Sequence, residues 1–169
     1  MGIEVSKNAI VNVSADRLWS ILADDFDKVG EWASGVDSSG PNTDAAVPEG
    51  ASVGGRVCQV PGFGDINETF TSFDPVERSF AFAATASKLP SFVRNVTNHT
   101  SVKSLGPEKS ELEVRTTADN LGVRGALVKP VMTRKFSQAI DAFLEDLKIF
   151  AESGKISSEK SKALAKEGR

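Results

Sequence analysis

The sequence contains one cysteine, one histidine and no tyrosine among its 169 residues. The lone Cys58 excludes a disulfide within the chain and a zinc site built on cysteines. The lone His99 has no cysteine partner and no carboxylates at the helical spacing of a metal site. No apolar run reaches the roughly 18 residues that a membrane-spanning helix requires. These absences predict a protein with no metal, no cofactor and no integral membrane segment.

The sequence also lacks a signal peptide and a basic stripe, and these absences bear on where the protein is located and what it binds. The N-terminus lacks both the basic start and the apolar core of a signal peptide, which predicts a cytoplasmic protein. The net charge is −3 and the isoelectric point is near 5.3. Because no basic stripe interleaved with aromatic residues is present either, a nucleic-acid partner is not expected. The sequence favours a small hydrophobic molecule as partner and does not identify any protein partner.

What the chain does contain is typical of a folded domain, with 40% hydrophobic and 25% charged residues. Its length suits one domain, which we place at residues 1–152. Ten phenylalanines and two tryptophans with no tyrosine make the large rings almost purely apolar. Residues 153–169 differ in carrying five basic and two acidic side chains, and we expect them to form a basic tail that is either a frayed helical extension or disordered.

The clearest periodic pattern predicts a helix that closes the domain between Met132 and Ala151. Apolar side chains recur there at the spacing of one helix face. They are Phe136, Ile140, Phe143, Leu144, Leu147 and Phe150. About 20 residues span about 30 Å at the helical rise, enough to cross a small sheet. Pro130 should start or kink this helix, and residues 120–125 should form a linker before it. Such a helix over a curved sheet can enclose a cavity.

Most of the preceding chain shows the alternation of apolar and polar residues that is typical of strands. A first strand over residues 3–13 is followed by two short helices, of which the first is capped by Ser14. After an extended segment and loop, strands are expected at 56–60, 65–73, 78–86, 92–105 and 111–119. Turns between successive strands make the sheet antiparallel. The expected class is α+β, with a curved antiparallel sheet of about six to seven strands wrapped round a long C-terminal helix.

This order of elements resembles the helix-grip fold of the SRPBCC superfamily, which includes START lipid-transfer domains and polyketide cyclase/dehydrase-like proteins. The opening segment VSADRLWSILADDFDKVGEWASGV and the hairpin GGRVCQVPGFGDINETFTSFDPVERSFAF are similar to the bacterial cyclase/dehydrase-like branch. The resemblance covers about residues 3–152 and consists of shape and spacing rather than a catalytic signature. It implies the fold, and beyond the fold either hydrophobic-ligand or lipid binding or an enzymatic reaction, since one fold hosts carriers, sensors and enzymes.

Glu68 is the candidate catalytic residue. It shares strand parity with Ile66 and Phe70, which places it on the apolar face of its strand. A carboxylate that points into an apolar cavity keeps its proton more readily and can act as a general acid or base. The alternatives are that Glu68 faces water near the turn or that it pairs with an arginine.

The candidate ligand-binding residues lie on faces expected to meet between sheet and helix, or in the short-helix region at one end. Large rings beside small side chains leave volume that a solid core would fill, although the same rings also suit plain core packing. The set comprises Phe26, Trp32, Phe70, Phe80, Phe82, Asn98, Thr100, Thr116, Phe136, Ile140 and Phe143. Arg115 and His99 have the opposite parity and are expected to face solvent.

The sequence is compatible with three functions. The leading interpretation is transport, storage or sensing of a small hydrophobic or aromatic molecule held between sheet and helix. The second is a polyketide cyclase/dehydratase-like enzyme in which Glu68 moves protons while Asn98 or Thr100 holds a carbonyl. The third is a non-catalytic protein-interaction module, which only the basic tail supports.

Overall fold

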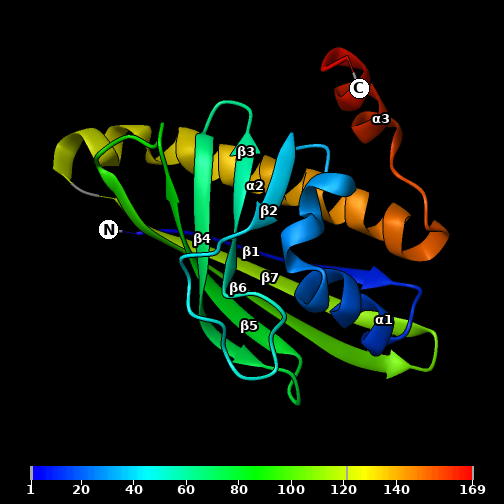
Figure 1. Ribbon diagram of the computed structural model, residues 1–169. Coiled ribbons are helices and arrows are strands. Elements are labelled where there is room, and N and C mark those ends of the chain that lie inside the picture. Colours follow the sequence, from blue (N-terminus) through cyan, green and yellow to red (C-terminus); the bar gives the residue numbers. More distant parts are fainter. Residues whose placement is uncertain (1, 121, 169) are drawn as a thin grey trace.

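The computed structural model describes residues 2–120 and 122–168. A seven-stranded antiparallel sheet curves beside one long helix, α2 (Figure 1). Its strand order is β1-β7-β6-β5-β4-β3-β2, so that β1 pairs with the last strand and every later strand pairs with its neighbour in sequence. The elements are β1 (Ile3–Val11), α1 (Ala15–Trp19), η1 (Ser20–Asp24), η2 (Phe26–Glu31), β2 (Ser38–Pro41), β3 (Gly55–Val60), β4 (Gly64–Asp74), β5 (Ser79–Ala86), β6 (Val93–Gly106), β7 (Lys109–Asn120), α2 (Gly122–Ser153) and α3 (Ser158–Lys166).

The predicted α+β helix-grip architecture is confirmed. The apolar stripe of the closing helix faces the sheet, because Ile140, Leu144 and Leu147 are buried and the phenylalanines of the stripe pack against the same core. α1, η1 and η2 follow β1 and cover one end of the sheet (Figure 1). α2 crosses the sheet as the spacing of its apolar residues requires.

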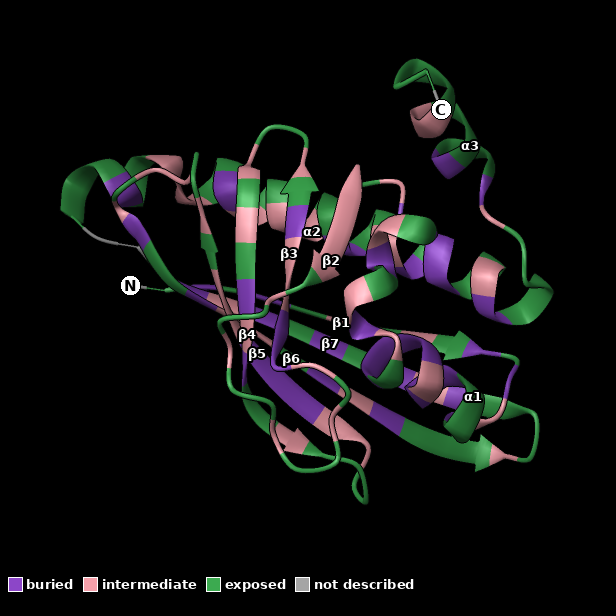
Figure 2. Cartoon of the chain, viewed as in Figure 1, coloured by how far each residue is buried: buried purple, intermediate pink, exposed green. Residues whose placement is uncertain are grey.

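Two apolar clusters hold α2 on the sheet. The larger one joins the short helices, the sheet and the C-terminal half of α2, and includes Leu18, Phe26 and Leu147. The smaller one lies under the N-terminal half of α2 and is built on Met132, Ile3 and further residues of β6 and β7. Buried positions are concentrated along the central strands and recur along α2, while most loop residues are intermediate or exposed (Figure 2). The helix is therefore anchored near both of its ends.

The start of α2 differs from the prediction. The helix begins at Gly122, within the stretch expected to be a linker, and Pro130 lies inside it rather than at its start. Gly125 and Met132 are buried in this first part. Packing of this kind outweighs the low helix propensity of glycine. Residue 121 lies outside the described residues.

A β-bulge in β4 changes which side chains point inward. The pairing of β4 with β5 shifts between Phe70 and Ser72, and after the shift Phe73 rather than Ser72 is opposite Phe80. Strict alternation would have placed Ser72 on the inner face. Phe73 instead packs against Trp19, with ring centroids 5.4 Å apart. Small differences also occur at β1, which ends at Val11, and in the extended segment after η2, where only β2 pairs.

Of the two alternatives for the tail over 153–169, the structure has a helical extension, because residues 158–166 form helix α3. This helix is docked on the domain and not frayed. Ser157 caps this helix, its hydroxyl accepting from the Lys160 N–H at 3.0 Å, and also donates to Asp146 of α2. Asp146 accepts a second hydrogen bond from the Ser34 N–H at 2.6 Å. The buried Lys160 ammonium donates to the Val36 carbonyl at 2.7 Å. Overall composition predicted a solvated tail, but a capping serine and two specific polar partners are enough to dock it.

Replacing Ser157 with alanine should lower the free energy of unfolding by about 1–2 kcal/mol, because both the helix cap and the hydrogen bond to Asp146 are lost. Ser158→Ala is the matched control, since Ser158 is exposed and its replacement should change stability by less than about 0.5 kcal/mol. Urea unfolding of the three proteins measures both values. Equal stability of the two variants would contradict the docking of α3.

Candidate ligand-binding site

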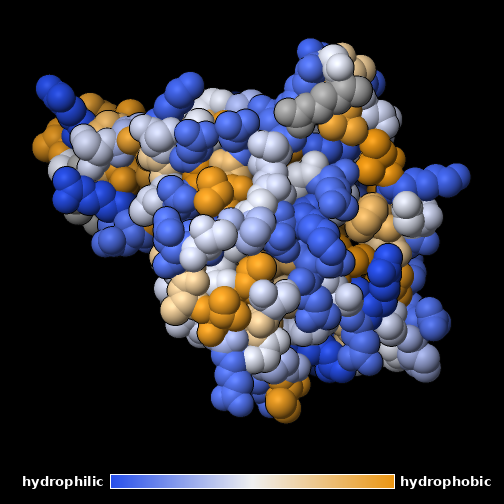
Figure 3. All heavy atoms as spheres, viewed as in Figure 1, coloured by the Kyte–Doolittle hydropathy of each residue, from blue (hydrophilic) through white to orange (hydrophobic). Residues whose placement is uncertain are grey.

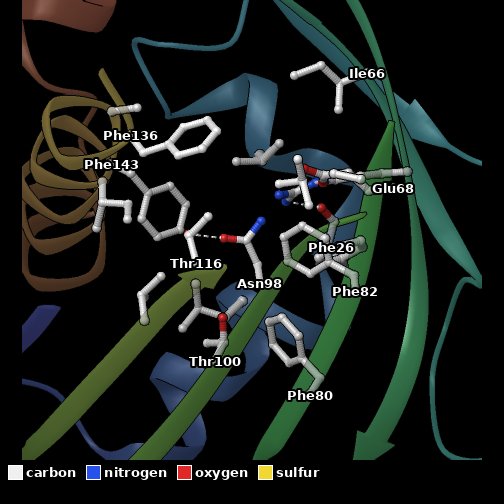
Figure 4. Close-up of a pocket in the computed structure, with 18 of the residues that line it drawn as sticks. Phe26, Ile66, Glu68, Phe80, Phe82, Asn98, Thr100, Thr116, Phe136 and Phe143 are labelled. Atoms are coloured by element: carbon white, nitrogen blue, oxygen red, sulfur yellow. Dashed lines mark hydrogen bonds and ion pairs between the residues drawn. The ribbon is translucent and has the colours of Figure 1, made fainter. Parts of the chain in front are cut away.

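A cavity of about 230 Å³ lies between the sheet and α2 (Figure 4). Its walls come from the short helices, from strands β3 to β7 and from α2. Apart from Phe70, every predicted ligand-binding residue lines it, as does Glu68. Those residues are Phe26, Trp32, Phe80, Phe82, Asn98, Thr100, Thr116, Phe136, Ile140 and Phe143.

Phe70 has a different place from the one expected. Its side chain is buried, with its ring 4.4 Å from that of Phe26 and 5.1 Å from that of Phe73. It packs behind Phe26 instead of lining the cavity. The inward parity of Phe70 was correct, but strand parity does not say which inward side chains are covered by others.

Aromatic rings form a large part of the cavity wall. Phe143 of α2 packs on Trp32, with centroids 5.1 Å apart, and Phe136 stacks on Phe63 of the β3–β4 turn at 6.5 Å. In Figure 4 these α2 rings stand across the space from Phe26, Phe82 and Glu68. The faces and edges of these rings line the cavity, and such a surface suits an apolar or aromatic ligand.

An ion pair is built into one side of this apolar wall. Arg56 of β3 donates from Nε to Oε2 of Glu68, its direct partner across β3 and β4. The two side chains are only 12% and 11% exposed. Arg56 also donates from Nη1 to the Phe26 carbonyl at 2.9 Å, and its guanidinium lies 4.1 Å from the Phe26 ring centroid. Glu68 therefore lines the cavity, as its strand parity predicts, and also pairs with an arginine; it does not face water.

Arg56 is the main residue that the sequence analysis missed. Its strand gave no clear parity, because Arg56, Cys58 and Val60 alternate with residues of similar polarity. The register of the hairpin supplies the missing information: counting outward from the Val60–Gly64 pair places Arg56 opposite Glu68. Gly55 lets the two strands meet at this point, since a Cβ there would lie 2.0 Å from the Glu68 carbonyl oxygen. Other lining residues outside the predicted set are apolar, among them Ile21, Leu22, Val29 and Val96.

A second polar group lies on the central strands. Thr116 of β7 donates from its hydroxyl to Oδ1 of Asn98, its cross-strand partner on β6. Within the described residues, the Nδ2 amide of Asn98 has no protein acceptor, and the Thr100 hydroxyl has no protein partner. Asn98 points into the space of Figure 4. The cavity thus holds a donor and a hydroxyl that are available to a ligand.

The remaining ionisable candidates lie away from the cavity. His99 is exposed on the outer side of the sheet, and Arg115, also on that side, pairs with Glu4 at 3.2 Å. Burial raises the pKa of the Cys58 thiol to about 12, mainly by desolvation, so this thiol is un-ionised at neutral pH and unreactive. Among residues 2–120 and 122–168, no group of histidine, cysteine and carboxylate side chains is arranged to hold a metal ion. In the same residues, no helix combines the length and apolarity needed to span a bilayer.

The family model described as polyketide cyclase/dehydrase and lipid transport matches residues 2–152. The chain belongs to this family. Among solved structures, an aromatase/cyclase from Streptomyces has 14% sequence identity and a TM-score of 0.65, over 93% of this chain and 100% of the other. A START superfamily protein from Mycobacterium smegmatis has 18% identity and a TM-score of 0.62, over 86% and 97% of the two chains.

The protein XoxI from Bacillus cereus is similar to the same degree, with 19% identity and a TM-score of 0.60 over 84% of this chain and 93% of the other. Comparison with curated protein sequences finds no match. At these identities the structural likeness shows the fold alone. The family is therefore known, and the chemistry of this member has to be inferred from its own cavity.

Replacing Arg56 with methionine should lower the free energy of unfolding by about 3–5 kcal/mol, because it leaves the Glu68 carboxylate buried without its partner. The double variant Arg56→Met/Glu68→Gln should be less destabilised than the single one. Arg115→Met, which breaks an exposed pair, is the matched control and should cost about 1 kcal/mol or less. Urea unfolding at neutral pH gives all three values, and similar losses for Arg56→Met and Arg115→Met would refute the buried pair.

Proposed function

We propose that the chain binds a small aromatic or otherwise hydrophobic molecule in the cavity between the sheet and α2. The observation that carries the proposal is the open volume of about 230 Å³ lined by aromatic and aliphatic side chains. A cavity of about 150 Å³ in another protein is enough to bind benzene, so this space is on the scale of one or two fused rings. Transport, storage and sensing all require such binding.

The polar groups of the cavity favour a ligand that carries oxygen. The Asn98 amide can donate to a carbonyl or hydroxyl oxygen, and the Thr100 hydroxyl can donate or accept. The Asn98 amide and the Thr100 hydroxyl lie among aromatic rings. A ligand that leaves them without a hydrogen bond binds less well than one that supplies it, which gives specificity. A phenol or an aromatic ketone satisfies both the rings and the amide, whereas a plain hydrocarbon leaves the amide without a partner.

Burial of the apolar surface of the ligand supplies part of the binding free energy. About 200 Å² of apolar ligand surface contributes roughly 5 kcal/mol at 25 cal/mol per Å² before the entropic cost of association. That free energy corresponds to a dissociation constant of about 0.2 mM before the cost of association is subtracted, so ring contacts and the hydrogen bond to Asn98 have to add to it. The family description, which joins polyketide cyclases and dehydrases with lipid transport, is consistent with ligands of this character.

2-Naphthol is a suitable probe, since it has two fused rings and one hydroxyl. Because Trp32 lines the cavity, titration with 2-naphthol should change the tryptophan fluorescence and saturate. Ala84 lines the cavity, so Ala84→Phe should fill part of it and weaken binding by about tenfold or more. Thr85→Phe, at the exposed neighbouring position of β5, is the matched control and should bind as the unmodified protein does. Absence of saturable binding for 2-naphthol and related one-ring to three-ring phenols would refute the proposal, as would equal binding by both variants.

A second candidate is an enzyme of the cyclase/dehydratase type, favoured by the presence of Glu68 and Asn98 in one cavity. Glu68 would exchange a proton with the ligand while Asn98 or Thr100 held a carbonyl oxygen. The pairing with Arg56 limits this reading, because the carboxylate already accepts a hydrogen bond from Nε. The protein-interaction reading is weakened by α3, which uses Lys160 of the basic tail within the domain.

The Glu68→Gln variant distinguishes a protein that only binds its ligand from an enzyme that converts it. If the protein only binds, this variant should keep its affinity for 2-naphthol within about threefold, and neither protein should convert an aromatic polyketone substrate. If Glu68 moves protons, the unmodified protein should show turnover of such a polyketone by liquid chromatography, and Glu68→Gln should lose it by about 100-fold or more. Turnover that is lost in Glu68→Gln while 2-naphthol binding persists would replace the carrier proposal by the enzyme.

A further inference from the structure

The N-terminal part of α2 carries an apolar face that nothing in the described structure covers. Val123, Leu127 and Val131 are 80%, 76% and 57% exposed. Their spacing of four residues places them in one row along the helix. Ala126 and Pro130 beside this row are also exposed. We name this surface, formed by residues 123, 126, 127, 130 and 131, the α2 apolar face.

The α2 apolar face lies on the side of the helix that points away from the core. The opposite side of the same turns is the one that packs, since Gly125 and Met132 are buried and Val128 contacts the smaller apolar cluster. A helix that is already anchored on one side and apolar on the other has two faces with different partners. Single exposed apolar residues are ordinary on protein surfaces, but a row of them together with proline and alanine marks an interaction site.

The charges beside the α2 apolar face all have one sign. Arg124, Lys129, Arg134 and Lys135 belong to the same turns, and no acidic residue occurs between Asp119 and Asp141. Within the described residues, none of the four basic side chains forms an ion pair. The chain as a whole has a net charge of −3. This part of α2 is therefore positively charged in a molecule that is negatively charged overall.

The position of the segment agrees with a role in docking. The first turns of α2 stand at one end of the molecule (Figure 1), and in the space-filling view apolar and strongly hydrophilic side chains adjoin each other there (Figure 3). One turn beyond the segment, Phe136 of the same helix lines the cavity. The α2 apolar face and one wall of the proposed binding site are therefore carried by the same helix, on opposite sides of it.

We propose that the α2 apolar face docks this protein reversibly on an anionic lipid bilayer. Apolar side chains flanked by lysine and arginine are what a helix lying in the interface plane presents to lipid. The apolar row enters the boundary between headgroups and acyl chains, and the basic side chains meet the lipid phosphates. Attraction to anionic headgroups accounts for the charge. A symmetric contact between two copies through this face would instead bring the basic side chains of both copies together, which is unfavourable.

The test is co-sedimentation of the full chain with vesicles. Binding to vesicles of phosphatidylcholine containing roughly one third phosphatidylserine should exceed binding to phosphatidylcholine alone by about tenfold or more. It should weaken when salt rises from about 0.1 M to about 1 M, which shortens the screening length from roughly 10 Å to roughly 3 Å. Leu127→Asp should reduce the bound fraction by about tenfold, and Lys135→Glu should reduce it on the anionic vesicles only.

Matched controls separate docking from general stickiness and from damage to the fold. Val76→Asp removes an 82% exposed apolar side chain in the β4–β5 turn, and Lys103→Glu reverses a charge on exposed β6; both should bind vesicles as the unmodified protein does. Thermal unfolding should be unchanged in Leu127→Asp because that side chain is exposed. Ala84→Phe, which blocks the cavity, should still bind vesicles, so failure of the binding proposal and failure of this one are distinguishable.

Two results would overturn the proposal. One is binding that is absent, or that Leu127→Asp leaves unchanged. The other is a dimer, detected by light scattering, that Leu127→Asp dissociates while neither protein sediments with anionic vesicles. In that case the α2 apolar face joins two copies of the chain instead of meeting lipid.

Discussion

The packing of α2 across the sheet is the constraint on which the rest of the structure depends. The helix is fixed near its start by Met132 in the smaller apolar cluster and farther along by Leu147 in the larger one. Asp146 of α2 also accepts hydrogen bonds from the Ser34 N–H and from Ser157, the residue that caps α3. A rod that is held at two places cannot settle into the middle of a curved sheet, so the space between the two anchors stays open.

The side chains that face this space keep it open. The central strands contribute Thr100 and Thr116, which are smaller than the leucine or phenylalanine that a filled core would need at the same points, and the polar side chain of Asn98. The rings of Phe26, Phe82 and Phe143 stand round them and not over them (Figure 4). Polar atoms within an apolar wall lower the stability of the ligand-free protein. A bound ligand that supplies their hydrogen-bond partners would offset this cost.

Local periodicity was enough to predict most of the candidate site. Strand parity placed Glu68, Asn98, Thr100 and Thr116 on the inner face because the side-chain period of a strand is local and strict. It failed for Phe70, which points inward but is covered by Phe26, because coverage depends on elements distant in sequence. Arg56 was missed since only the register of the β3–β4 hairpin brings it to Glu68.

The fold followed from the same patterns, and its exceptions have specific causes. The order of strands and helices indicated the helix-grip architecture, but the bulge near Phe70 could not be foreseen from alternation alone. The helix α3 formed in a segment whose composition suggests disorder, because Ser157 and Lys160 find partners that belong to other elements. In both cases a few tertiary hydrogen bonds or pairings decide the outcome, and average composition does not record them.

The cavity between the sheet and α2 has to admit a ligand, and a crystal structure of the full chain grown with 2-naphthol tests this most directly. We expect density for the fused rings between Phe82 and Phe143, with the hydroxyl oxygen at about 2.7–3.2 Å from the Asn98 amide nitrogen. A structure in which α2 and its phenylalanines close onto β6 and β7, with 2-naphthol bound elsewhere or not at all, would contradict the account.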